Sequence, residues 1–305
     1  MTEPLESTRP DQTPGKAPGS APGAGAEAKV AFQDVHKAFG DLVVLDGLDL
    51  EVTEGESLVV IGGSGVGKSV MLKHVIGLLH PDSGRVLVDG ADLAQMGNRE
   101  LTRFRSRFGM AFQEGALFDS MTVSGNVGFA LRRLTDLSPR QIADRVDECL
   151  GLVRLEGVGE KMPSELSGGM RRRVGFARAI AHEPEILLFD EPTTGLDPVT
   201  TALIDEVIVD LTTSLRTTAI TITHDMASAF RIADRIGLLY RGRIVALAPP
   251  EEFRALDDPR VQQFIHGEAE GPLSDPREAL GRPRDAGTEA AGEAAGARDS
   301  ERGAR

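Results

Sequence analysis

A glycine-rich segment followed by Lys and Ser carries the clearest chemistry in this sequence. Residues 62–69 read Gly-Gly-Ser-Gly-Val-Gly-Lys-Ser and match the pattern G-x-x-x-x-G-K-[S/T]. Glycines let successive backbone N–H groups point at one polyanion, and the unpaired N–H groups at the start of a helix favour the same charge. Lys68 is therefore expected to contact the β- and γ-phosphates of a nucleotide, and Ser69 to bind Mg²⁺. The alternative is a glycine turn followed by a chance Lys-Ser pair.

The segments on both sides of this loop favour the phosphate-binding interpretation. Residues 58–61 form a short apolar run, which indicates a buried strand. After the loop, a helix is predicted to turn one apolar stripe toward a sheet. This stripe consists of Met71, Val75, Leu78 and Leu79. Strand, glycine loop and helix in this order are the structural context that the motif requires.

A second apolar run ends in two carboxylates. Residues 186–189 read Ile-Leu-Leu-Phe and are followed by Asp190 and Glu191. A strand that ends in acids is the second half of a nucleotide site of this kind, in which one acid holds Mg²⁺ and another polarises a water molecule.

Two further polar residues follow predicted strands. Gln113 comes after residues 108–112, and His224 comes after residues 218–223. Each residue taken alone is more often solvated or structural than functional. Both are predicted to lie at the sheet edge where α/β proteins bind ligands, so both are candidates for contacts in the site.

The residues Leu166-Ser167-Gly168-Gly169-Met170 open another predicted helix. Backbone N–H groups at such a helix start could bind an anion, whereas the commoner role of a Ser at this place is a simple N-cap. The next three residues, Arg171 to Arg173, are predicted to form a solvated face.

An earlier helix is predicted from residue 138 onward. Ser138-Pro139-Arg140-Gln141 is a capping box with proline at the first helical position. The apolar stripe that follows contains Ile142, Val146, Cys149, Leu150 and Val153. Cys149 is therefore interpreted as a packing residue and not as a reactive thiol.

Composition bounds the folded part and the class of protein. The chain has 305 residues, and both ends, 1–27 and 274–305, are rich in small and polar residues and are predicted to be disordered tails. The net charge of −13 argues against a nucleic-acid partner. A single cysteine excludes an internal disulfide. No apolar run approaches the ~18 residues of a membrane span, and no secretion signal is present, so a partner would have to supply any membrane span.

The motifs in this order resemble the nucleotide-binding subunits of ABC transporters. The resemblance covers the loop 62–69, Gln113, the segment 166–170, the acidic strand 186–191, residues 195–198 and His224. It implies an α/β fold of the P-loop NTPase type with a RecA-like core sheet, an antiparallel β subdomain and an α-helical signature subdomain. In this scheme the ABC ATPase domain covers residues 28–250, and the helical subdomain covers about 115–183.

The resemblance also assigns roles to single residues. Glu191 would be the general base, His224 would contact the γ-phosphate, and Gln113 would sense the metal and the attacking water. The implied metal ligands are Ser69, Gln113 and Asp190, the last through water. The implied ATP-binding residues are Phe39, Gly62, Gly63, Ser64, Gly65, Val66, Gly67, Lys68, Ser69, Asp190, Ser167, Gly168, Gly169 and Asp197. Phe39 stands where the family usually has an adenine-stacking tyrosine, although a Phe is more often a core residue.

The family pattern implies partners as well. Ser167, Gly168 and Gly169 would complete the ATP site of an opposite subunit, which gives a head-to-tail homodimer with two ATP molecules. Integral-membrane permease subunits are expected, with Leu117 and Phe118 as docking residues if they are not simply core. The chain would then lie in the cytoplasm, peripheral on the inner face of the cell membrane.

Finer details are similar to the ATPases of MCE-associated, Mla-type lipid transport systems. These details are Met170 in the signature, the residues 115–119 after Gln113, and the C-terminal stretches 258–264 and 271–272. The resemblance implies phospholipid or related lipid transport with an MCE-domain lipid-binding protein, and it identifies neither the lipid nor the direction.

The C-terminal segment 251–273 is predicted to contact the partner ATPase. Val261, Phe264 and Ile265 form a small apolar face that needs a cover.

Three other functions remain open. They are an ABC ATPase for another substrate, a soluble non-transport ABC ATPase, and an ATP-binding module without hydrolysis. Residues 70–165 lack the long heptad insertion of chromosome-maintenance ATPases. Glu191 and His224 argue against the non-hydrolysing module.

Overall fold

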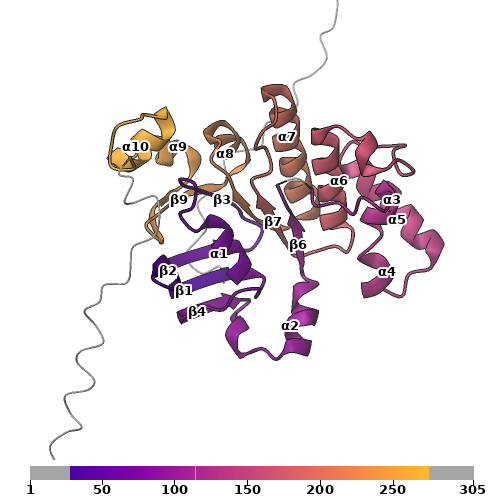
Figure 1. Ribbon diagram of the computed structural model, residues 1–305, viewed down its shortest axis with the longest axis horizontal. Helices are drawn as coiled ribbons and strands as arrows, with labels where there is room; N and C mark the ends of the chain where they lie inside the picture. Colours follow the sequence, from indigo (N-terminus) through magenta and orange to yellow (C-terminus); the bar gives the residue numbers. More distant parts are fainter. Residues whose placement is uncertain (1–27, 114, 275–305) are drawn as a thin grey trace, which may run out of the picture.

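The computed structural model describes residues 28–113 and 115–274 (Figure 1). The predicted disordered tails lie outside the described residues, apart from residue 274.

A six-stranded sheet forms the centre of the described fold. Its strands are β3 (Ser57–Ile61), β6 (Phe108–Ala111), β7 (Ile186–Asp190), β8 (Thr218–Ile222), β9 (Arg235–Tyr240) and β10 (Arg243–Ala248). They lie in the order β10-β9-β3-β8-β7-β6, and all neighbouring pairs are parallel except β10 with β9. Because parallel strands run in the same direction, the carboxyl ends of β3, β6, β7 and β8 lie at the same edge of the sheet.

A smaller antiparallel sheet covers the first part of the chain. Its strands are β1 (Ala28–Phe39), β2 (Leu42–Thr53), β4 (Ser83–Val88) and β5 (Ala91–Asp92), in the order β2-β1-β4-β5. The chain turns at Asp89 and Gly90, and Leu87 pairs with Asp92, so the short β5 covers the outer side of β4.

Ten α-helices are present in the described residues. They are α1 (Lys68–Val75), α2 (Asn98–Arg105), α3 (Val123–Val127), α4 (Leu131–Leu134), α5 (Pro139–Leu152), α6 (Gly168–Ile180), α7 (Pro198–Leu215), α8 (Met226–Ile232), α9 (Pro250–Ala255) and α10 (Pro259–His266). Short 3₁₀ turns cover Leu93–Gln95 and Pro163–Glu165. Figure 1 shows α3, α4 and α5 at one end of the molecule and α9 and α10 at the other. Within the described ranges, no helix is both long and apolar enough to cross a membrane.

Two apolar cores hold the strand that precedes the glycine loop. The side chains of β3 alternate between them: Val59 and Ile61 belong to the core that includes α5, α6 and α7, and Leu58 and Val60 belong to the core shared with β1, β2 and α1. This two-residue alternation is that of a strand buried on both faces. The end of β3, where the loop starts, is thereby fixed from both sides.

The helix after the loop is shorter than the sequence pattern predicts. Met71 and Val75 are fully buried as expected, but α1 ends at Val75 and the backbone turns at Gly77. Leu78 is 54% exposed, so the apolar stripe does not extend to it.

Helix α5 forms as predicted. The Ser138 side chain accepts a hydrogen bond from the Gln141 backbone N–H, and the Gln141 side chain accepts one from the Ser138 N–H. The predicted stripe is buried, and burial raises the pKa of the Cys149 thiol to about 11. A thiol with a raised pKa is a poor nucleophile, which agrees with a packing role.

Candidate active site

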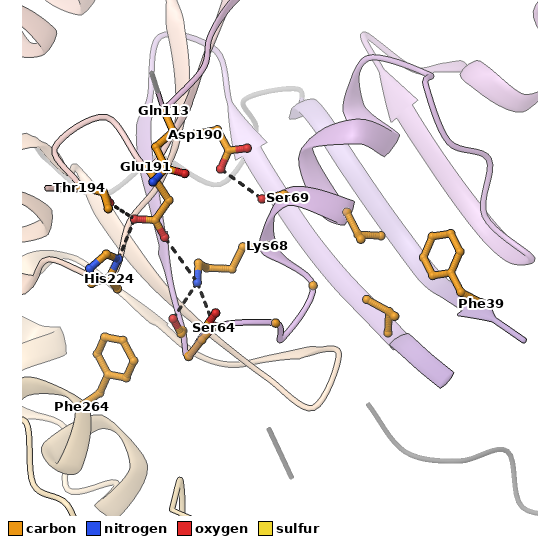
Figure 2. A pocket seen from close by; sticks show the side chains of 16 residues that line it. Phe39, Ser64, Lys68, Ser69, Gln113, Asp190, Glu191, Thr194, His224 and Phe264 are labelled. Atoms are coloured by element: carbon orange, nitrogen blue, oxygen red, sulfur yellow. Dashed lines mark hydrogen bonds and ion pairs between the residues drawn. The ribbon is translucent and has the colours of Figure 1, made fainter. Parts of the chain in front are cut away.

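A cavity of about 670 Å³ lies at the carboxyl edge of the large sheet (Figure 2). Most of the predicted site residues line it. These are Phe39, Gly62, Gly63, Ser64, Gly65, Gly67, Lys68, Ser69, Gln113, Asp190, Glu191 and His224. They come from the ends of β1, β3, β6, β7 and β8, so separate parts of the sequence meet at one site.

The glycine loop wraps the base of this cavity. Gly67, the N-cap of α1, has φ +107°, and a Cβ atom there would lie 2.9 Å from Val44 Cγ1. Only glycine takes this conformation in so close a space. The buried Lys68 Nζ donates to the Gly62 and Gly63 carbonyl oxygens at 2.8 and 2.9 Å. Burial lowers the pKa of Lys68, partly opposed by attraction to Glu191.

Glu191 has an unusual backbone conformation. Its φ is +51°, a value that residues other than glycine rarely adopt. Its N–H still donates to the Ile222 carbonyl oxygen at 2.9 Å. The carboxylate lies among three polar groups that Figure 2 shows converging on it. Oε2 accepts from His224 Nδ1 at 2.7 Å and from Thr194 Oγ1 at 2.8 Å, and Oε1 lies 3.7 Å from Lys68 Nζ. Strained residues of this kind cluster at functional sites.

Ser69 and Asp190 form a pair of oxygen donors beside the loop. The Ser69 hydroxyl donates to Asp190 Oδ1 at 3.2 Å, and burial raises the pKa of Asp190 despite this hydrogen bond. Burial makes this carboxylate costly to ionise unless a cation lies beside it. Mg²⁺ takes oxygen ligands and usually binds only one or two protein carboxylates, so a carboxylate next to a hydroxyl fits this metal. Gln113 lines the same cavity and adds an amide oxygen.

Two aromatic rings lie on opposite sides of the loop. Phe39 is 47% exposed at the end of β1, with Lys37 Nζ 5.6 Å from the centre of its ring. An exposed ring at the cavity is available for stacking, as the sequence predicts. Phe264 of α10 lies on the other side, nearer His224, in Figure 2.

Four lining residues were not predicted, namely Val44, Val70, Thr194 and Phe264. For Thr194 a signal existed, because a hydroxyl three residues after a carboxylate can donate a hydrogen bond to it. For Phe264 the apolar spacing was seen, but spacing does not tell which neighbour covers a face. Val261 of that face is fully buried in this chain's own core, so the chain itself covers this part of the face.

Five predicted ATP-binding residues do not line this cavity. They are Val66, Ser167, Gly168, Gly169 and Asp197. Val66 packs against the core around β3 and α1. Ser167 caps α6 by accepting from the Met170 N–H at 3.3 Å, and Asp197 caps α7 by accepting from two backbone N–H groups. Ser167 and Gly168 are exposed, at the start of a 13-residue helix whose first N–H groups favour an anion.

The prediction of a solvated arginine face is correct for Arg171, which is exposed, and wrong for Arg172, which is buried. Arg172 is only 8% exposed, and Arg171 and Arg173 also bend back to main-chain oxygens. Arg171 donates to the Leu166 carbonyl, and Arg173 to the Val153 and Arg154 carbonyls. Helical spacing places all three on α6, but it does not show that neighbouring loops offer acceptors.

Fold and site together define an ATP-binding cassette, and the family model described as ABC transporter matches residues 45–194. The chain belongs to this family and is an ABC-type ATPase, which confirms the predicted fold class.

Individual relatives sharpen the comparison. The chain is 41% identical over 234 residues to the intermembrane phospholipid transport system ATP-binding protein MlaF of Haemophilus influenzae, which covers 77% of this chain and 89% of that protein. It is 42% identical over 237 residues to the probable ribonucleotide transport ATP-binding protein mkl of Mycobacterium leprae, covering 78% and 68%. Among solved structures, the dimeric post-hydrolysis state of the cassette MJ0796 with ADP and Pi superposes with a TM-score of 0.65, at 31% identity, covering 72% of this chain and 98% of that one.

Proposed function

We propose that this chain is the ATP-hydrolysing subunit of a transporter that moves phospholipid with an MCE-type lipid-binding partner and membrane permease subunits. The resemblance to a phospholipid transport ATPase over most of both chains supports the substrate class. A ribonucleotide transporter is the second candidate, because another relative of similar identity carries that name.

The arrangement around Glu191 supports hydrolysis by a water molecule in line with the γ-phosphate. Glu191 takes the proton of the attacking water as general base. His224 and Thr194 hold its Oε2, so the carboxylate presents a defined orientation toward the cavity. When ATP binds, Lys68 exchanges its hydrogen bonds to the loop carbonyls for hydrogen bonds to the β- and γ-phosphate oxygens. This exchange favours binding, because charge-assisted hydrogen bonds to phosphate are stronger than those to neutral carbonyls.

Mg²⁺ is the proposed cofactor alongside ATP. Ser69 and Asp190 would hold it, with Gln113 nearby, and the metal would neutralise charge on the phosphates.

One observation carries the proposal that the working unit is a homodimer. The exposed Ser167 and Gly168, with Gly169 and Asp197, lie outside the cavity that is lined by all the other predicted ATP-binding residues except Val66. We infer that these four residues meet the nucleotide of a second copy, so that two ATP molecules lie between two chains. Closure of the two copies then assembles each site, as in other enzymes that complete their catalytic groups on closing.

Placement at the membrane follows from the same proposal. The chain would lie on the cytoplasmic face through the permease, with the half-exposed Phe118 as a docking residue, while Leu117 packs against the core. The division into an ATPase domain (28–250), with its helical subdomain (115–183), and a dimer-contact segment (251–273) stays a prediction.

The test is to purify the chain with its membrane partners, identify those partners, and measure ATP hydrolysis in lipid nanodiscs. We expect a permease and an MCE-domain protein to copurify and phospholipid presented to the complex to raise hydrolysis. Stimulation by ribonucleotides without any effect of phospholipid would overturn the lipid assignment in favour of the second candidate.

A further inference from the structure

A buried arginine of helix α6 touches both loops that carry the catalytic residues. Arg172 Nε donates to the Gln113 carbonyl oxygen at 2.6 Å, and a second guanidinium nitrogen donates to the Thr194 carbonyl oxygen. The Thr194 hydroxyl in turn donates to Glu191 Oε2 at 2.8 Å. Arg172 is thus one hydrogen bond from the backbone of Gln113 and two from the carboxylate of Glu191.

The segment after Gln113 is fixed to the same helix. Gly115 and Gly175 approach so closely that a Cβ atom on Gly175 would lie 3.0 Å from Gly115 Cα. Arg178, further along α6, donates to the Gly115 and Ala116 carbonyl oxygens at 2.8 and 2.7 Å. Because close packing and two arginines hold this segment, it follows any displacement of α6.

The opposite end of α6 carries the residues that we assign to the second copy's nucleotide. Ser167 is its N-cap, and Gly169 lies in its first turn, where a Cβ atom would come 2.6 Å from Thr200 Cγ2 of α7. Arg172 is in the second turn of this helix. One short rigid element therefore joins the exposed Ser167 to the loops of Gln113 and Glu191 within the same chain.

We propose that Arg172 is a positioning residue that couples the two ATP sites of the dimer. When Ser167 of one copy contacts the nucleotide of the other, α6 of the first copy shifts. Arg172 then transmits this shift to Gln113 and Glu191 of the same copy. This inference rests on the proposed dimer. It assigns to Arg172 no contact with nucleotide or metal.

A double-mutant cycle tests the coupling, because residues that act through one another show non-additive effects. The variants are Arg172→Met and Ser167→Ala, singly and together, in the full chain, with kcat and KM for MgATP as readouts. Arg173→Met is the matched control, since Arg173 lies on the same helix and, in the part of the chain that the structure describes, donates to the Val153 and Arg154 carbonyls.

We expect Arg172→Met to lower kcat by about 10- to 100-fold, the effect of losing hydrogen bonds from a charged group, with KM changed less than about 2-fold. Ser167→Ala alone should lower kcat by about 100-fold, and in the Arg172→Met background it should lower kcat by clearly less than that. With Arg173→Met the effect of Ser167→Ala should stay complete. Arg172→Lys, which retains the charge and reaches fewer acceptors, should give an intermediate kcat and serves in the cycle if Arg172→Met does not fold.

Additive effects of Arg172 and Ser167 would overturn the coupling. So would equal non-additivity with Arg173→Met, because Arg172 would then act only through general stability. Failure of the proposed function gives a different result, namely a wild-type chain without MgATP hydrolysis or one whose kcat does not respond to Ser167→Ala.

Discussion

Two parts of the molecule carry the predicted ATP-binding residues, and they differ in how their polar groups are satisfied. Around the glycine loop, Lys68 donates to a loop carbonyl and lies near the Glu191 carboxylate, and Ser69 donates to the Asp190 carboxylate, all at the wall of one cavity. At the start of α6, Ser167 and Gly168 are exposed and do not line that cavity. In the proposed dimer, the first region binds the nucleotide of its own chain, whereas the second meets the nucleotide of another copy.

The largest effect is expected from a substitution in the first region that slows ATP hydrolysis and leaves ATP binding intact. Glu191→Gln should lower ATP turnover by about 10²- to 10⁴-fold, the range for loss of a general base, while ATP still binds. Steady-state phosphate release and equilibrium binding of labelled ATP measure the two properties. Wild-type turnover in this variant would remove Glu191 from its assigned role.

The next effect comes from the second region. Ser167→Arg places a bulky cation at the start of α6 and should lower turnover by about 10²- to 10³-fold, as for loss of a preorganised contact to a phosphate. ATP affinity of the single chain should change less than about 2-fold, since Ser167 does not line the cavity. Weakened binding by an isolated chain would show that the two regions are not separate.

Lys68→Ala tests the first region through the affinity for ATP and not through the rate of hydrolysis. Loss of a charged hydrogen-bond donor should weaken ATP binding by about 10- to 100-fold. Titration of the single chain with labelled ATP gives the affinity, and Lys73→Ala on the same helix is the control. Unchanged affinity would contradict the phosphate contact of Lys68.

The smallest effect concerns stability and pH. Burial raises the pKa of Asp190, so its contribution to stability is complete below the unfolded-state pKa and is lost as pH rises through the folded-state pKa. Asp190→Asn should therefore raise the melting temperature of the nucleotide-free chain at pH 7, and the difference should shrink as pH falls through the folded-state pKa.

The exposed Asp197 is the control, because the pH dependence of its contribution to stability has the opposite sign. Hydrogen bonds from Thr200 and from the backbone lower its pKa, so its contribution is present above the unfolded-state pKa and is lost as pH falls through the lowered folded-state pKa. Asp197→Asn should slightly lower the melting temperature at pH 7. Thermal scans from pH 3 to 8 decide both, and a lower melting temperature of Asp190→Asn at pH 7 would contradict the assigned cost of its charge.

The same contrast explains what could be predicted from the sequence. Loop, acids and polar strand ends were found because strand, turn and helix patterns are local and because parallel strands bring their ends to one edge. Arg172 was misjudged because its acceptors, the carbonyls of Gln113 and Thr194, are distant in sequence. Phe264 was not predicted to line the cavity because an apolar face does not specify what it packs against.

The most direct test of the account is the mass of Glu191→Gln in solution, measured by sedimentation with and without MgATP. Two copies should associate when ATP is added and separate when it is removed, and adding Ser167→Arg should keep the chain single while ATP remains bound. A single-chain mass for Glu191→Gln saturated with ATP, or a dimer that Ser167→Arg does not disturb, would contradict the claim that each copy completes the other's site.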